Sequence, residues 1–202
     1  MSYDRSMKTR IVFLLLLPVL LLGCTTVSPP ARFYMLSPLA QPQAMRVPEM
    51  LVGVGPVKLA DYLDRNQLVS RTSEVGLKLD EFNRWAGGLD RNITQVVAEN
   101  LSRLMTIDGV LAYPWSSAIE LDYQIMLDIS RFDAGPGDEA ILAVQWQLFD
   151  QRRRRLVEVQ RGHFQVEVRG ADQQAVVRAQ SEALVQLSEA LAQAIESAVS
   201  GE

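Results

Sequence analysis

Alternation of hydrophobic and polar residues dominates the second half of the chain and is typical of strands with one buried face. Two segments rich in turn-forming or charged residues, 133–138 and 150–155, interrupt the alternation and predict an antiparallel meander. In the last strand of this meander, the apolar positions that face inward change from odd to even residue numbers at Arg161-Gly162, which predicts a β-bulge there. The three predicted strands cover 119–132, 140–149 and 156–169.

Shorter apolar runs predict the other strands. One of them contains Gly53, Gly55 and Pro56, but no Lys-Ser or Lys-Thr pair follows, so a phosphate-binding loop is not indicated. A strand with close backbone approach at its glycines explains this run better. These shorter strands are expected at 33–36, 50–57, the end of 59–71, 75–79 and 110–113.

Two segments carry apolar residues at spacings of three and four, as helices with one buried face do. The first is Leu89 to Thr106, and the second is a long helix that begins at Asp172, whose side chain can cap it. The whole pattern predicts an α/β domain, with a mixed sheet of about five or six strands covered by two main helices.

The beginning of the chain has the layout of a bacterial export signal. Lys8 and Arg10 precede the apolar run 11–22, and Gly23-Cys24 follows it. Twelve helical residues cover about 18 Å, against a hydrocarbon core of about 30 Å, so a membrane-spanning anchor is disfavoured. The end of the run instead resembles the lipobox of bacterial lipoproteins.

This resemblance implies cleavage between Gly23 and Cys24 and acylation of Cys24, with palmitate among the acyl chains. Because two or more chains make a lasting anchor, we expect a membrane-bound protein. Thr25 occupies the place where Asp directs retention at the inner membrane, so the resemblance implies the periplasmic face of the outer membrane. Met7 is as good a start as Met1, because basic residues follow it directly.

We therefore expect a lipoprotein signal peptide at 1–23, a lipidated, Pro-containing tether at 24–32 and a single periplasmic α/β domain at 33–202. Removing the signal peptide takes away three cations and one anion, so the net charge falls from −4 to −6. This acidic balance disfavours non-specific binding to nucleic acid. Since the only cysteine would carry lipid, no thiol remains for a disulfide, a zinc site or a nucleophile.

Three motifs resemble the auxiliary lipoproteins of ABC-type transport systems, the paraquat-inducible protein C-like family. Asn66 stands where that family usually has Pro, and Gly87-Gly88 where Glu-Pro is common; both departures fall in predicted turns. The resemblance extends over the whole mature chain. Its motifs are Tyr34-Met35-Leu36, Tyr62 to Arg71 (YLDRNQLVSR) and Arg84 to Leu89 (RWAGGL).

The resemblance also implies a fold and a function. The family has an anticodon-binding-like α/β fold and works beside MCE proteins that bridge the periplasm and move lipid between membranes. Its members assemble as rings at the outer membrane. The chain is thus expected to be a homo-oligomeric docking ring, with no enzymatic activity, cofactor, metal or nucleic-acid partner. Two alternatives stay open: a periplasmic carrier that binds lipid or a hydrophobic solute in its own cavity, and an envelope hydrolase, which needs a nucleophile and a base within hydrogen-bond reach.

The charged and aromatic motif residues have three open interpretations: a buried ion network that pins loops, a partner interface, or ligand chemistry. A carboxylate beside guanidinium groups is a poor general base near neutral pH, which disfavours catalysis. Trp85, next to two glycines, is expected to cover the core. The residues concerned are Tyr62, Leu63, Asp64, Arg65, Gln67, Arg71, Arg84 and Trp85.

The four consecutive arginines predict either a solvated turn or a contact with an acidic partner or lipid headgroups. No aromatic residue lies among them to stack on bases, so nucleic-acid binding is not indicated. His163, the only histidine, lies within a predicted strand and has no further histidine for a metal site. The arginines are Arg152, Arg153, Arg154 and Arg155.

Overall fold

The computed structural model describes residues 29–38, 40–41, 47–135 and 137–201. Its contacts divide the chain into Met1–Pro30 and Ala31–Glu202, and all helices and strands described below belong to the second unit. The predicted lipidation and cleavage positions, Cys24 and Gly23, lie outside the described residues. Within those residues, no helix combines the length and the apolar character that a membrane crossing needs.

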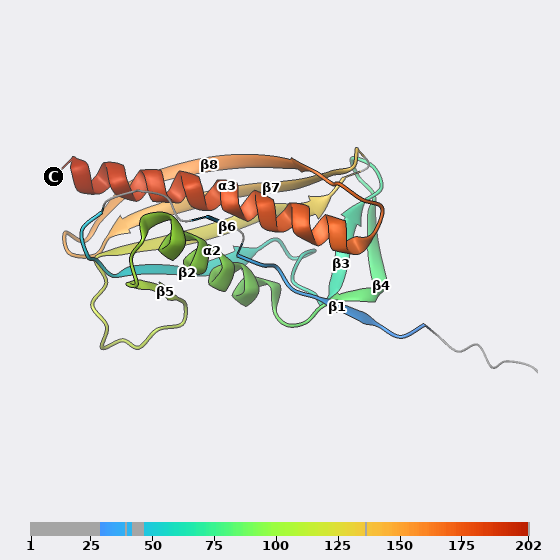
Figure 1. Ribbon diagram of the computed structural model, residues 1–202, viewed down its shortest axis with the longest axis horizontal. Helices are drawn as coiled ribbons and strands as arrows, with labels where there is room; N and C mark the ends of the chain where they lie inside the picture. Colours follow the sequence, from blue (N-terminus) through green and yellow to red (C-terminus); the bar gives the residue numbers. More distant parts are fainter. Residues whose placement is uncertain (1–28, 39, 42–46, 136, 202) are drawn as a thin grey trace, which may run out of the picture. The chain divides into compact units, whose positions relative to one another are not determined.

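The predicted meander forms the body of the sheet (Figure 1). Both of its strand pairs are antiparallel, and β6 pairs with β7 from Tyr123 opposite Asp150 to Ala134 opposite Ala140. Alternate β7 side chains, from Leu142 to Leu148, are buried, as the alternation predicts. The strands are β6 (Tyr123–Ala134), β7 (Glu139–Asp150) and β8 (Arg155–Glu167).

Five further strands extend the sheet along the other side of β6. β2 lies parallel to β6 and to β5, whereas β3 joins only the far end of β6, where Ser70 pairs with Ala134. β3 continues into antiparallel β4 and then parallel β1. The sheet has eight strands rather than about five or six, because even three-residue strands join it. Their bounds are β1 (Arg32–Tyr34), β2 (Val52–Leu59), β3 (Gln67–Arg71), β4 (Leu77–Trp85) and β5 (Val110–Ala112).

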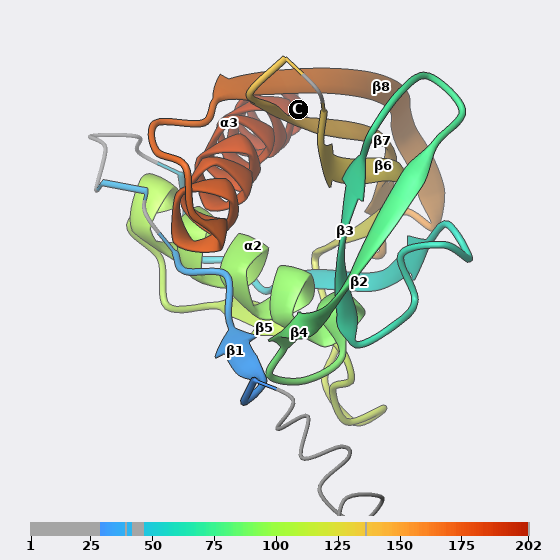
Figure 2. The ribbon, with the colours of Figure 1, turned by 90° about the vertical axis from the view of Figure 1, so that its right-hand side faces the viewer.

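Both helices cover the same face of this sheet. α2 (Leu89–Met105) packs on β2 and β5, and α3 (Gln173–Ser200) packs on β6, β7 and β8 and against α2 (Figure 2). Asp172 caps α3 as predicted, because its Oδ1 accepts a hydrogen bond from the Ala175 N–H at 2.9 Å. The two predicted helices and the mixed sheet confirm the α/β fold.

The bulge predicted at Arg161-Gly162 is wrong. Both residues pair with β7 in unbroken register, and the shift falls near the start of β8, at Val157. Val159 explains the misleading pattern, because this apolar residue is 48% exposed on the outward face of β8, whereas Phe164 and Val166 are partly buried on the other face. The Phe164 ring lies beside Gly162, where a Cβ would be 2.5 Å from its Cε2.

β4 is longer than the predicted strand at 75–79. The carboxylate of Asp80 accepts hydrogen bonds from the backbone N–H groups of Phe82 (3.1 Å) and Asn83 (3.0 Å). This local bend interrupts the β3–β4 ladder, which resumes where Gln67 pairs with Arg84. The strand therefore continues through the second motif segment to Trp85.

The domain has two distinct ends along β6 (Figure 1). At the Ala134 end, β3 leads to β4 and β1, where the chain enters from residue 31. At the Tyr123 end lies the turn that joins β7 to β8. Eleven residue steps separate these ends, which corresponds to about 36 Å of extended strand.

Candidate functional site

The strands bring the three sequence motifs together at the Ala134 end. Tyr34 of β1 pairs with Trp85 of β4, and Gln67 of β3 pairs with Arg84. The Trp85 N–H also donates to the Asn66 carbonyl at 2.7 Å. Segments that lie as far apart in the sequence as Tyr34 and Trp85 thus form one continuous patch of sheet.

A buried carboxylate lies beside this patch. The side chain of Asp133, near the end of β6, is 0% exposed and accepts three hydrogen bonds. Tyr62 Oη (2.8 Å) and Arg71 Nε (3.2 Å) donate to Oδ2, and Arg131 Nε (2.9 Å) donates to Oδ1. Two guanidinium groups and one phenol therefore satisfy the buried charge, which holds the segment 62–71 against β6.

The electrostatics of this cluster favour a neutral phenol. Burial raises the pKa of the Tyr62 hydroxyl, and the hydrogen bond to and negative charge of Asp133 raise it further, although Arg71 opposes the shift. The Arg71 guanidinium carbon also lies 5.6 Å from the centre of the Tyr62 ring. The hydrogen bond with Tyr62 and the Asp133 charge raise the pKa of Arg71, so its cation is retained.

Sequence reasoning missed Asp133 because it follows an alternating strand directly and precedes a Gly-Pro-Gly turn. It places Asp64 among the arginines instead, but Asp64 is exposed and Arg71 pairs with Asp133. Tyr62 and Arg71 lie more than sixty residues before Asp133. The only sequence signal is a charged residue at the end of a strand, and it does not identify these partners.

The other motif residues have varied surroundings. Leu63 is 2% exposed and belongs to the core, whereas Arg65 is half-buried with an Nε atom that has no hydrogen-bond partner among the described residues. Arg84 is held by Glu81, whose carbonyl accepts from Arg84 Nε at 2.9 Å. Trp85 is 6% exposed and contributes to the core, where its position matches the expected lid.

The four arginines lie at the Tyr123 end, in and beside the β7–β8 turn. Buried Asp150 binds two of them, with Arg153 Nη1 at 3.5 Å and Arg155 Nε at 3.7 Å. Arg152 forms an ion pair with Asp122. Arg154 is exposed, has a left-handed backbone (φ +51°), and makes no ion pair with any residue that the structure describes.

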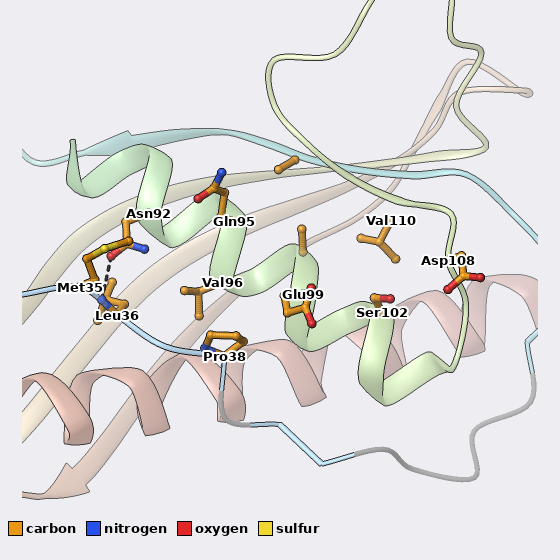
Figure 3. Close-up of a pocket in the computed structure, with 12 residues that line it drawn as sticks. Met35, Leu36, Pro38, Asn92, Gln95, Val96, Glu99, Ser102, Asp108 and Val110 are labelled. Atoms are coloured by element: carbon orange, nitrogen blue, oxygen red, sulfur yellow. Dashed lines mark hydrogen bonds between the residues drawn. The ribbon is translucent and has the colours of Figure 1, made fainter. Parts of the chain in front are cut away.

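A surface groove of about 550 Å³ runs along the outer side of α2 (Figure 3). The segment 35–38 forms one wall, where the Leu36 N–H donates to Asn92 Oδ1 at 2.8 Å, and β5 forms the other. Two of its polar groups are already engaged: Ser102 Oγ donates to the Ile107 carbonyl at 2.7 Å, and Glu99 binds Arg103 at 3.0 Å. The groove offers shape for an interacting segment but no activated nucleophile.

Side chains fill the space between the helices and the sheet. Ile93 and Leu101 of α2, Leu187 of α3 and Ile125 of β6 are each 0% exposed and belong to one core cluster. A carrier would need a cavity of several hundred Å³ in this position. This packing weighs against the carrier interpretation.

His163 lies exposed on β8, opposite Ala143.

Comparison with known proteins gives one family. The family model described as the ABC-type transport auxiliary lipoprotein component matches residues 34–192. No curated protein sequence matches the chain.

Solved structures share this fold. The crystal structure of protein XCC0632 from Xanthomonas campestris, of family DUF330, aligns with a TM-score of 0.68 at 18% identity, over 82% of this chain and 96% of that protein. A crystal structure of an uncharacterised protein aligns with a TM-score of 0.65 at 21% identity, over 83% of this chain and 99% of that one. At these identities the likeness establishes the fold alone.

Proposed function

Because this chain belongs to the family of ABC-type transport auxiliary lipoprotein components, we propose that it is a non-catalytic subunit of an intermembrane lipid transport system. The match over residues 34–192 is the observation that carries the proposal. Acyl chains on Cys24 anchor the protein in the outer membrane, and the domain faces the periplasm. There it forms a homo-oligomeric ring that docks a periplasm-spanning MCE-domain protein.

The open edges of the sheet support a ring. Within the part of the chain that the structure describes, β5 pairs only with β2, and β8 pairs only with β7. These two edges differ in sequence and length, so a contact between unlike edges of neighbouring copies is head-to-tail. Head-to-tail contacts generate closed rings when the rotation between copies divides a full turn.

The turn 151–154 supports docking at the Tyr123 end. Asp122 and Asp150 neutralise part of its charge and fix its backbone, while Arg154 keeps a solvent-exposed cation. This end lies about 36 Å along β6 from the strands at which the tether enters. An acidic surface on the MCE partner would meet this cation at the end of the domain remote from the tether.

The absence of catalysis is part of the same proposal. Asp133, the buried carboxylate, is held by three donors and is a poor base. Ser102 in the α2 groove donates its hydroxyl hydrogen to a backbone carbonyl.

The lipid anchor is tested by Cys24→Ala. We expect the variant to lose its acyl chains and to leave the outer-membrane fraction, because the domain has no other covalent anchor in the proposal. Fractionation followed by immunoblotting measures this, and intact-mass spectrometry of the wild-type protein determines acylation. A wild-type protein without acyl chains would overturn the anchor.

Docking is tested by Arg154→Glu in the acylated protein. We expect reduced co-purification of the MCE-domain partner from detergent-solubilised envelopes, since the variant reverses an exposed charge that forms no ion pair with the residues that the structure describes. Arg178→Glu makes the same charge change at an exposed position on α3 and serves as the control. Equal capture by Arg154→Glu and wild type would exclude the turn as the docking surface.

A further inference from the structure

An exposed apolar surface lies at the Ala134 end of the domain. Eleven large hydrophobic side chains are exposed among the residues that the structure describes. Six of them fall within two short segments, 33–35 and 75–82, which belong to β1, β4 and the β3–β4 turn. This concentration requires an explanation, because single exposed hydrophobic residues are ordinary but a contiguous patch marks an interaction site.

Strand register places three of the six, Phe33, Leu77 and Leu79, on one face, and Phe82 lies two residues before Arg84 of that face, in the stretch of β4 that β3 leaves unpaired. Arg84 of β4 pairs with Phe33 of β1 on one side and with Gln67 of β3 on the other. Val69 lies two positions after Gln67 in β3, and it pairs with Leu79 of β4. Paired residues and residues two apart project on the same side of a sheet. We call this surface the outer hairpin face; it comprises Phe33 (65% exposed), Leu77 (41%), Leu79 (39%) and Phe82 (41%).

The outer hairpin face is closely balanced in charge. Arg84, which shares it, lies with Nη2 3.7 Å from a carboxylate oxygen of Glu81. Val75, in the turn at its tip, is 94% exposed. The chain as a whole is acidic. An occupant of this face is therefore held by burial of apolar side chains rather than by net charge.

We infer that the outer hairpin face docks on the surface of the lipid bilayer. This inference rests on the proposed acylation of Cys24. Seven residues separate Cys24 from Arg32, and eight Cα–Cα steps span at most about 29 Å in any conformation. Since β1 begins at Arg32 and pairs with β4, the anchor keeps this face within reach of lipid (Figure 2).

A lipid interface suits this surface better than a folded partner does. Its apolar side chains project from a two-stranded hairpin and one edge strand, and a bilayer interface accepts projecting side chains without a complementary shape. Aromatic residues such as Phe33 and Phe82 partition well into the boundary between headgroups and acyl chains. The acyl chains and the outer hairpin face thus form two contacts with one membrane, which orients the domain.

The test uses the acylated protein in phosphatidylcholine vesicles. Its single cysteine is occupied by lipid in the proposal, so an introduced cysteine is a unique site for an environment-sensitive dye. Phe33→Cys and Leu79→Cys report on the outer hairpin face. Leu156→Cys, 50% exposed at the opposite end, is the matched control. We expect a blue shift and quenching by lipid-borne nitroxide at 33 and 79, but neither change at 156.

Several outcomes separate this inference from the proposed anchor. A protein that fails to stay with the vesicles shows that the anchor is absent. A protein that stays with them while the dyes at 33 and 79 remain in water overturns the membrane contact alone. Equal quenching at 33 and 156 also overturns it, because the domain then has no preferred face. A concentration-dependent blue shift without lipid-borne quenching assigns the face to a second copy instead.

Discussion

At the scale of single residues, one carboxylate ties the most distinctive motif to the body of the fold. Asp133 is the common partner of Tyr62, Arg71 and Arg131. A buried carboxylate is tolerated only when charges and hydrogen bonds compensate its lost hydration, and here three donors do so. The motif residues Tyr62 and Arg71 are thus explained by a structural contact.

Asp133→Asn should destabilise the protein strongly. The amide keeps the shape but removes the charge that balances two guanidinium groups, which are 21% and 27% exposed. We expect the free energy of unfolding to fall by about 3 kcal/mol. Urea unfolding measures it. Asp128→Asn is the control, since Asp128 is 53% exposed and pairs with an exposed lysine, and it should change stability by less than about 0.5 kcal/mol.

Tyr62 should make stability depend on alkaline pH. Its raised pKa means that the folded state retains the phenol proton at a pH at which the unfolded chain has lost it. The contribution of this pKa shift to the free energy of unfolding is therefore complete below about pH 10, and it is lost as the pH rises through the raised pKa of Tyr62. Tyr62→Phe should be less stable by about 1 kcal/mol at neutral pH because it lacks the hydrogen bond to Asp133. The difference in free energy of unfolding between the wild type and Tyr62→Phe should become smaller above pH 10. A difference that stays the same across this pH range, measured by urea unfolding, would contradict the prediction.

At the scale of elements, the glycines of β2 allow neighbouring segments to lie close to its backbone. A Cβ at Gly53 would lie 2.5 Å from Leu121 Cδ1 and 2.8 Å from Trp115 Cη2. The loop after β5 therefore packs directly on the β2 backbone. This contact agrees with the prediction of a strand whose glycines allow close approach to its backbone. The absence of a Lys-Ser/Thr pair likewise favours such a strand over a phosphate-binding loop.

Gly53→Ala and Gly87→Ala should have opposite effects. The first forces two large side chains apart and should lower the free energy of unfolding by about 1–3 kcal/mol. The second adds a methyl group where no atom lies within 4 Å, and it reduces the freedom of the unfolded chain. It should raise stability by about 0.5 kcal/mol. Thermal unfolding of both variants checks this, and two effects of the same sign would refute the geometric argument.

At the scale of the whole domain, the outer hairpin face and the arginine turn lie at opposite ends of β6. The Ala134 end carries the motif strands and the outer hairpin face, and the Tyr123 end carries the arginine turn (Figure 1). In the proposed function these ends meet a membrane and a protein partner, respectively. A subunit that joins two unlike surfaces requires such a division.

The sequence alone determined the elements whose signal is local. Alternation and helical spacing predicted the meander, both helices and the Asp172 cap, because each depends on residues within a few positions of one another. Three motifs indicated the family by the same local information. Each of these features can be recognised from residues that are close together in the sequence.

Only the tertiary structure decided which of these local features meet. It brought Arg71 to Asp133, placed the bulge at Val157 and not at Gly162, and joined all eight strands in one sheet. Each outcome depends on the pairing of residues that are not neighbours in the sequence. Buried charges and close packing select their partners by distance in space, which the order of residues does not specify.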